Sequence, residues 1–170
     1  MKFSDKPETR KGALGEAIVH RHLESRGLIV YQPQTDGAHP FDNLCASRDK
    51  KTIVIAEVKT KPRRLYYPDT GIDIRHYNDY MHIQTKYGIP VFLYFVDAES
   101  EKRIYGNKLI VLIASRQVEH NGKLLTYPIK SKGIIYFPLD AMLHVADLDA
   151  GDTQEIAALT TRNEHYKYAG

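Results

Sequence analysis

The stretch that decides the fold is residues 40–60, PFDNLCASRDKKTIVIAEVKT. Its second half, Thr52–Thr60, holds four isoleucine or valine residues among nine, which makes it the strongest strand prediction in the chain. The first half predicts another strand over Pro40–Ser47, because a proline is tolerated at the first position of a strand. The polar segment Arg48–Lys51 between them predicts a hairpin turn. The two strands are therefore expected to pair antiparallel.

Two charged residues lie near the end of the second strand of this hairpin. Side chains alternate across a strand, so Glu57 and Lys59 are expected on the same face. That face also carries Ile53 and Ile55, whereas the opposite face carries Val54, Ala56 and Val58. Burying two charges on an apolar face is costly unless they have partners or a metal ion. A strand that simply emerges into solvent at Glu57 would explain this pair alone equally well.

A second acid, Asp42, is expected to meet Glu57 across the hairpin. Pairing Asn43–Ser47 with Thr52–Ala56 leaves Asp42 beside Glu57. Two adjacent carboxylates repel each other, and a divalent cation is the usual remedy. Ligands that are all oxygen favour magnesium or manganese over zinc. The simpler alternative is an aspartate that ends a strand or forms a turn after proline.

A third acid, Glu16, lies on the first expected helix. This helix spans Asp5–Arg26, with Gly27 as its C-terminal cap. Glu16 shares a helical stripe with Gly12, Val19 and Leu23. Small residues at Gly12, Ala13 and Gly15 would let this helix approach the sheet closely. A glutamate at the exposed edge of the helix is the alternative.

The rest of the chain predicts an α/β fold with a sheet of mixed strand direction. Around the hairpin we expect a strand at Leu28–Gln32, a turn at Gln34–His39, a loop at Lys61–Gly71, a helix from a cap at Asp73 to before Gly88, and a strand at Pro90–Val96. Beyond these, strand-like runs cover Ile104–Ala114 and Leu124–Phe137 with a turn at Asn121-Gly122, and short helices are expected at Pro138–Val145 and Thr153–Arg162. A single domain over residues 1–170 is expected, with a core at about 8–98 and a C-terminal elaboration at about 99–170.

The combination of these motifs resembles the PD-(D/E)xK nuclease superfamily, which includes restriction enzymes, archaeal-type Holliday junction resolvases and RecB-like exonucleases. The matching residues are Glu16, Pro40-Phe41-Asp42 and Glu57-Val58-Lys59. The resemblance covers residues 10–97 and departs in one place, because Phe41 intervenes between Pro40 and Asp42. It implies a restriction-endonuclease-like core in the order αβββαβ. In that core a central mixed β-sheet of four or more strands is flanked by helices, here with C-terminal strand and helix additions.

The resemblance also implies the chemistry. Asp42, Glu57 and the backbone carbonyl of Val58 would hold Mg²⁺, or Mn²⁺ in its place, with Glu16 as an outer or second-metal ligand. Lys59 would orient the attacking water or neutralise charge on the phosphate. The implied activity is hydrolysis of phosphodiester bonds in DNA by an endonuclease of repair or recombination that acts as a homodimer. The alternative is a non-catalytic nucleic-acid-binding or assembly protein, encoded by a phage or mobile element, that kept the fold.

A basic and aromatic segment follows the Glu-x-Lys strand and is a candidate nucleic-acid contact. Its residues are Lys61, Arg63, Arg64, Tyr66 and Tyr67, which could contact phosphates and stack on bases. A solvated loop is the alternative. Farther along, the second expected helix carries a stripe of Ile74, Tyr77, Met81 and Gln84 at helical spacing. Gln84 is expected to make either a structural hydrogen bond or a substrate contact.

Composition limits the other possibilities. The net charge of +3 is compatible with a nucleic-acid partner but does not by itself require one. The one cysteine, Cys45, excludes an internal disulfide. No stretch is long and apolar enough to span a bilayer, and the first ten residues lack the apolar core of a signal peptide. A cytoplasmic protein without a membrane partner is expected.

Overall fold

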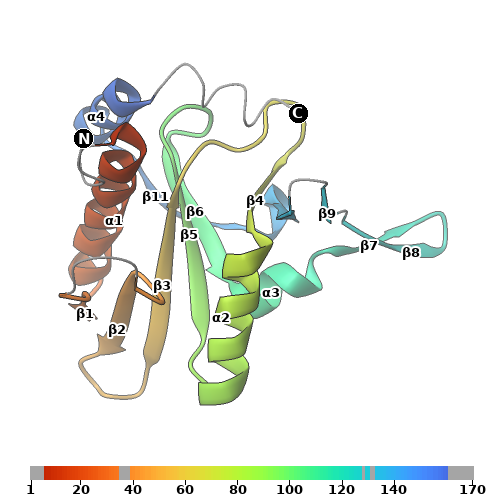
Figure 1. The fold of residues 1–170 in the computed structure, drawn as a ribbon, viewed down its shortest axis with the longest axis horizontal. Helices are drawn as coiled ribbons and strands as arrows, with labels where there is room; N and C mark the ends of the chain where they lie inside the picture. The colour runs from red at the N-terminus through yellow and green to blue at the C-terminus, as the bar shows by residue number, and fades with distance from the viewer. Residues whose placement is uncertain (1–5, 35–38, 128, 131–132, 161–170) are drawn as a thin grey trace.

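A computed structural model describes residues 6–34, 39–127, 129–130 and 133–160 (Figure 1). Its main layer is a six-stranded sheet in the order β1-β2-β3-β5-β6-β11. The strands are β1 (Leu28–Tyr31), β2 (Asn43–Ser47), β3 (Ile53–Thr60), β5 (Val91–Asp97), β6 (Arg103–Lys108) and β11 (Leu143–Asp147). Only β3 and β5 pair in parallel within this sheet. The expected mixed sheet is thus confirmed.

The β2–β3 hairpin and the parallel β3–β5 pair form the centre of the sheet. Parallel neighbours need a crossover connection of a dozen or more residues. Here that connection contains β4 (Asp69–Asp73) and α2 (Ile74–Tyr87). The crossover therefore carries α2 onto one face of the sheet, beside the strand that bears Glu57.

Helices cover both faces of the sheet (Figure 1). On one face, α1 (Pro7–Ser25) and α4 (Ala150–Leu159) enclose a core of Ile18, Val19, Leu23, Cys45, Ala56, Val58, Tyr94, Val96, Ala98, Ile104 and Ile156. On the other, α2 and α3 (Leu109–Ala114) enclose Ile55, Ile72, Tyr80, Val91, Leu93, Phe95, Tyr105, Leu109, Leu112, Ile135 and Phe137. In the described part of the chain, none of the helices has the length and apolar character to cross a membrane.

The first helix approaches the sheet closely at one glycine, as its small residues predict. A Cβ atom at Gly15 would lie 1.8 Å from Thr60 Oγ1, whereas one at Gly12 would meet nothing within 4 Å. Gly15 therefore sets the distance between α1 and β3. The helix ends as predicted before Gly27, which has a positive φ of 84°.

The second helix begins and ends where the sequence predicts. The Asp73 carboxylate accepts a hydrogen bond from the Arg75 backbone N–H at 2.8 Å, and Gly88 closes the helix in the left-handed conformation. Its buried residue is Tyr80, which precedes Met81 of the expected stripe by one position. The helix thereby points a phenol at the sheet.

A small second sheet in the order β4-β10-β9 corrects the prediction of a continuous loop over Lys61–Gly71. Its strands β10 (Ile134–Pro138) and β9 (Ile129–Lys130) lie some sixty residues beyond β4 in the chain. A Cβ at Gly71 would come 2.3 Å from the Ile135 carbonyl oxygen, so glycine permits the pairing. Such a short strand is stabilised by a distant partner and has little local signal.

The C-terminal part departs from prediction in two places. Ile104–Ala114 is a strand followed by helix α3, and Pro138–Val145 is a 3₁₀ turn, η2 (Leu139–Ala141), followed by the start of β11. In both places apolar residues without a clear period allow either structure. The Asn121-Gly122 turn is confirmed, with φ of 50° and 71°, between β7 (Gln117–His120) and β8 (Lys123–Thr126).

The last predicted helix and one predicted turn fall partly outside the description. Helix α4 begins at Ala150, three residues before the expected start at Thr153. Its Asp149 cap accepts a hydrogen bond from the Asp152 backbone N–H at 2.7 Å. The end of the predicted range, residues 161–162, and the centre of the predicted turn at residues 35–38 lie outside the described residues.

Candidate active site

The hairpin register brings two carboxylates together. Asn43 pairs with Ala56, so the preceding residue, Asp42, comes opposite Glu57, as predicted. The Asp42 backbone N–H donates to Glu57 Oε2 at 3.2 Å. In return the Val58 backbone N–H donates to Asp42 Oδ2 at 2.7 Å. Each carboxylate is thus oriented by the backbone of the other strand.

The backbone carbonyl of Val58 is directed toward the same place. The N–H and C=O groups of one strand residue point to the same side of the strand. Because the Val58 N–H reaches Asp42, its carbonyl is also directed to the side where Asp42 lies. The β2–β3 ladder ends at the Asn43–Ala56 pair, so this carbonyl lies beyond the paired residues of β2. The Val58 carbonyl therefore lies on the same side of β3 as Asp42.

Glu57 is the most enclosed of the predicted acids, with only 3% of its surface exposed. Its Oε1 accepts a hydrogen bond from Lys59 Nζ at 2.6 Å and another from the Tyr80 hydroxyl. Burial and the negative charge of Glu57 raise the pKa of Tyr80, so the phenol keeps its proton and remains a donor. The Glu57 carboxylate is thus faced by the Lys59 ammonium group and by two further donors inside the core.

Tyr80 is a site residue that the sequence interpretation missed. The predicted stripe of α2 comprised Ile74, Tyr77, Met81 and Gln84. Tyr80 follows Tyr77 by three residues and precedes Gln84 by four, so the same periodicity contained it. The overlooked signal was chemical, since a buried tyrosine needs a partner for its hydroxyl.

Burial and mutual repulsion raise the pKa of the acids. Burial, followed by the negative charge of Glu57, raises the pKa of Asp42 to about 7, although Lys59 and the Val58 N–H act in the opposite direction. Burial also raises the pKa of Glu16, and Glu57 adds to this, whereas His39 and Lys59 lower it. Glu16 on α1 thus shares the electrostatic environment of the hairpin acids. Negative charge accumulates there, as it would around a cation site.

The donor set fits a hydrated magnesium ion. All candidate ligands are oxygen atoms. The pKa of Asp42 is raised first by burial and then by the negative charge of Glu57, and a cation would relieve that repulsion. Within residues 6–34, 39–127, 129–130 and 133–160, no three His, Cys, Asp or Glu side chains cluster closely enough to hold a metal ion. Magnesium usually needs only one or two carboxylates, with water and substrate phosphate completing its shell. A closed zinc site does not fit these residues.

The two arginines of the basic segment, predicted as phosphate contacts, form ion pairs with carboxylates of the protein. Arg64 is 4% exposed, and its Nε and Nη2 donate to the two Asp69 carboxylate oxygens at 2.5 Å each. Arg63 Nε donates to Glu101 at 2.8 Å. Both guanidinium groups therefore bind carboxylates of the protein, and these ion pairs stabilise the conformation of the loop.

The remaining residues of the segment are placed differently. Burial and nearby Lys59 lower the pKa of Lys61 to about 7, with Asp69 acting against them. Tyr66 and Tyr67 are exposed. Farther away, Gln84 Oε1 accepts a hydrogen bond from the Val91 backbone N–H at 3.2 Å, the structural one of its two predicted roles.

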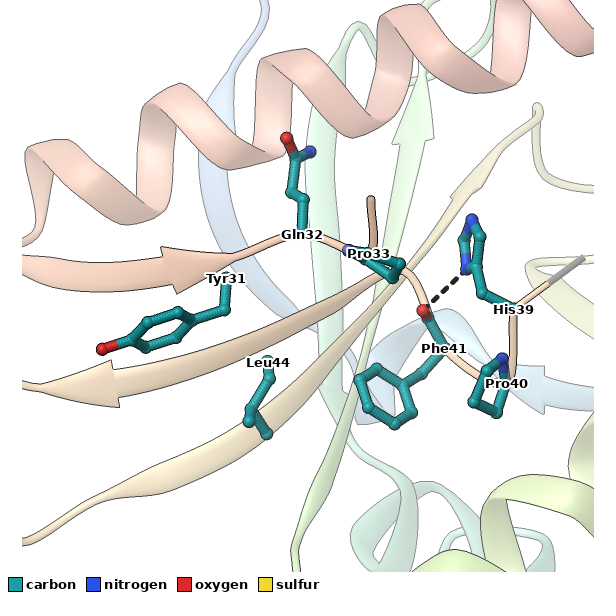
Figure 2. A pocket seen from close by; sticks show the side chains of 7 residues that line it. All are labelled: Tyr31, Gln32, Pro33, His39, Pro40, Phe41 and Leu44. Carbon is teal, nitrogen blue, oxygen red and sulfur yellow. Dashed lines mark hydrogen bonds between the residues drawn. The ribbon is translucent and has the colours of Figure 1, made fainter. Parts of the chain in front are cut away.

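A cavity of about 470 Å³ lies where the end of β1 and the segment before β2 come together (Figure 2). It is lined by Tyr31, Gln32, Pro33, His39, Pro40, Phe41 and Leu44. His39 Nδ1 lies 2.8 Å from the Phe41 carbonyl oxygen and must donate to it, since a carbonyl only accepts. The cavity is mainly apolar, with polar groups at Gln32 and His39.

The chain matches no protein-family model and no curated protein. Among solved structures it is similar to Hjc, a Holliday junction resolvase from Archaeoglobus fulgidus, with a TM-score of 0.52. The match covers 79% of this chain and 96% of that chain at 12% identity. At that identity the likeness shows the fold alone. The expected restriction-endonuclease-like α/β fold is thereby confirmed.

Proposed function

We propose that the chain is a nuclease that hydrolyses phosphodiester bonds in DNA with the help of a divalent metal ion. The observation that carries this proposal is the hydrogen-bonded Asp42–Glu57 pair with Lys59 on the same carboxylate. Repulsion between two buried acids destabilises the fold if the pair is purely structural. At a cation site the bound ion neutralises that repulsion, and the paired negative charges attract the ion. The shared fold with a Holliday junction resolvase adds support.

Each residue has a defined part in this proposal. Asp42, Glu57 and the Val58 carbonyl would hold Mg²⁺, with Mn²⁺ able to substitute and Glu16 as an outer ligand. Such an ion, when bound, supplies positive charge to the scissile phosphate and lowers the pKa of a bound water. Lys59, half-buried at the end of β3, would donate a hydrogen bond to that water or to a phosphate oxygen. Tyr80 would keep the Glu57 carboxylate oriented.

The proposed substrate is DNA, in a cytoplasmic repair or recombination reaction. This part rests on the structural neighbour, which acts at Holliday junctions. Cleaving two strands of such a substrate requires two active sites, so we expect a homodimer. Light scattering of the purified protein measures its molar mass and so distinguishes a dimer from a monomer.

One observation favours the alternative of a non-catalytic nucleic-acid-binding or assembly protein. Both oxygens of Glu57 accept hydrogen bonds from the protein, two on Oε1 and one on Oε2. A carboxylate satisfied in this way can serve the fold without a metal ion. The two functions can be distinguished by DNA cleavage, which only the nuclease performs.

Cleavage of plasmid, single-stranded and four-way-junction DNA with Mg²⁺ or Mn²⁺ tests the proposal. We expect the wild type to cut at least one of them and Lys59→Ala to lose about 10²-fold or more in rate. Lys51→Ala is the matched control, because Lys51 is an exposed lysine just before the opposite end of β3. If the wild type cuts none of these DNAs with either metal, yet binds DNA as tightly as Lys59→Ala, the alternative holds.

A further inference from the structure

The loop between β3 and β4 presents three consecutive large apolar side chains to solvent. Leu65, Tyr66 and Tyr67 are 61%, 72% and 50% exposed. Single exposed apolar residues are common on protein surfaces, but such a run usually has a function. The loop tip Leu65–Tyr66 is therefore a candidate contact surface.

This loop is closed on itself by a buried ion pair. Besides the two hydrogen bonds between their side chains, the Arg64 backbone N–H donates to the Asp69 carbonyl at 2.9 Å. The Arg64 guanidinium carbon also lies 4.2 Å from the centroid of the Tyr67 ring and 3.9 Å from that of Tyr136 on β10. The residues on either side of the tip are thus fixed to each other and to the second sheet.

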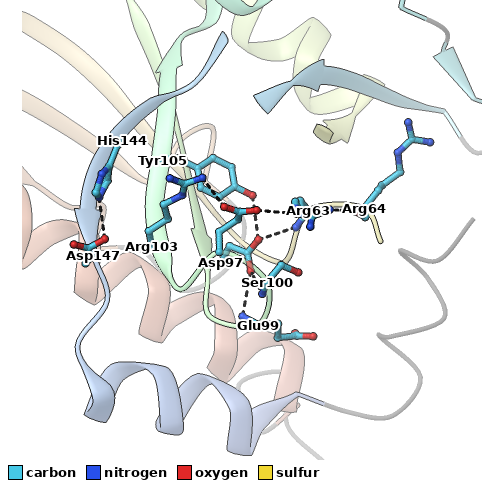
Figure 3. A network of polar contacts seen from close by, with 10 residues as sticks. Arg63, Arg64, Asp97, Glu99, Ser100, Arg103, Tyr105, His144 and Asp147 are labelled. Carbon is cyan, nitrogen blue, oxygen red and sulfur yellow. Dashed lines mark hydrogen bonds and ion pairs between the residues drawn. The ribbon is translucent and has the colours of Figure 1, made fainter. Parts of the chain in front are cut away.

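A second network fixes the base of the loop (Figure 3). The Asp97 side chain, at the end of β5, accepts hydrogen bonds from the backbone N–H groups of Arg63 at 2.9 Å and Ser100 at 2.8 Å. Arg63 in turn reaches Glu101 in the turn after β5. The tip is held in place before any ligand arrives, so little ordering entropy remains to be lost on binding.

The tip also lies within reach of DNA at the proposed active site. Tyr66 follows Lys59 by seven positions in the chain, and an extended chain of that length spans at most about 25 Å. One turn of a DNA duplex is about 34 Å long. A DNA molecule with its scissile phosphate near Lys59 is therefore long enough to reach the loop tip.

We propose that Leu65 and Tyr66 form a wedge that stacks on unpaired nucleobases, so that the protein prefers DNA with interrupted stacking over continuous duplex. This inference rests on the proposed function and names its substrate class. An aromatic ring stacks on any exposed base, and apolar side chains insert where stacking is already broken. A continuous duplex covers its base faces, leaving only sugars and phosphates for the tip to contact.

A fluorescent reporter at the tip tests the wedge directly. The chain has no tryptophan, so Tyr66→Trp carries a single reporter. We expect its emission to fall by about half or more, as stacking on bases quenches indole, when a duplex with a three-nucleotide bulge is added in EDTA. The same duplex without the bulge should change it much less. Tyr87→Trp is the matched control, because Tyr87 is also exposed but lies at the far end of α2.

Binding measurements complete the test. The double variant Leu65→Ala, Tyr66→Ala should lose about tenfold in affinity for bulged DNA and keep its affinity for continuous duplex, as read by fluorescence anisotropy. Equal losses on both DNAs, or unchanged Tyr66→Trp emission with DNA bound, would overturn the wedge and leave DNA binding intact. Failure of the wild type to bind any DNA would instead overturn the proposed function. Unchanged thermal unfolding of each variant shows that the fold is retained.

Discussion

Asp42 is the residue at which folding and function oppose each other. Its carboxylate is oriented by the Val58 N–H and lies against Glu57 inside the protein. Without a cation, burial and repulsion favour its protonated form and raise its pKa to about 7. A residue held in this way costs stability at neutral pH, as active-site residues often do.

We therefore expect Asp42→Asn to change how stability depends on pH. In the unfolded chain Asp42 ionises near its ordinary value of 3.8, whereas in the fold it keeps its proton up to about 7. The unfolded state binds fewer protons in that window, so the free energy of unfolding of the wild type falls as pH rises from about 4 to 7. Asparagine does not titrate and keeps an oxygen for the Val58 N–H. In EDTA, urea unfolding should show a flatter pH dependence and higher stability at pH 8 for Asp42→Asn.

The same two proteins can also be compared with and without Mg²⁺. At pH 8 Mg²⁺ should raise the melting temperature of the wild type but not that of Asp42→Asn, because the variant lacks one of the two ligand charges. At pH 5 the increase should be smaller, since protons compete for the same carboxylate. Parallel pH profiles for the two proteins would contradict the raised pKa, and an equal Mg²⁺ effect would contradict the proposed metal site.

Tyr80 supports the site from α2. Its hydroxyl donates to Glu57, and its ring packs in the core. Tyr80→Phe keeps the ring and removes the donor, so we expect about a 10- to 100-fold loss in cleavage rate or metal affinity. Tyr77→Phe removes a hydroxyl from the same core one turn earlier and should have little effect on either. Equal activity of the two variants in a single-turnover cleavage assay would show that the Tyr80 hydroxyl has no such role.

At the scale of elements, the contact between α1 and β3 depends on Gly15. An alanine Cβ there would overlap Thr60, so Gly15→Ala should destabilise the fold by about 1–3 kcal/mol. Gly12→Ala in the same helix meets open space and should stabilise it by about 0.5–1 kcal/mol through helix propensity. Denaturant unfolding of both variants measures these changes. Stabilisation by Gly15→Ala would mean that the helix can move away from the sheet without cost.

Elements with a local pattern could be predicted from the sequence, and those stabilised by distant pairing could not. The hairpin at residues 40–60 and helix α2 have their own turn or cap residues, and both were correctly placed. Strand β4 has five residues and depends on β10, so it was taken for a loop. Strand β11 was taken for part of a helix because its partner, β6, lies about forty residues earlier.

The same distinction applies to the candidate site. Asp42, Glu57 and Lys59 could be placed together because one hairpin carries all three. The ion pair of Arg64 with Asp69 escaped prediction although only five residues separate them, since the loop conformation depends on the pairing of β4 with β10. Tyr80 escaped because its partner lies on another element.

At the scale of the whole molecule, the C-terminal part completes the fold described by the first hundred residues. β6 and β11 extend the main sheet, while β10 and β9 pair with β4. Helix α4 lies against α1, where Arg21 Nη2 donates to both Asp152 carboxylate oxygens at 2.8 Å. The net charge of +3 is small, so long-range attraction to DNA would be weak. Recognition would then depend on shape and stacking at short range.

The parallel pairing of β3 with β5 has a consequence for the order of folding. The β2–β3 hairpin is local and can close in about 1–10 μs, whereas β3 and β5 pair only after residues 61–90 have been bridged. Asp42 and Glu57 would first meet while surrounded by water, where two charges about 4 Å apart repel by only about 1 kcal/mol. The two carboxylates lose their water only when β5 and α2 dock onto the hairpin. The same docking step brings the Tyr80 hydroxyl to Glu57.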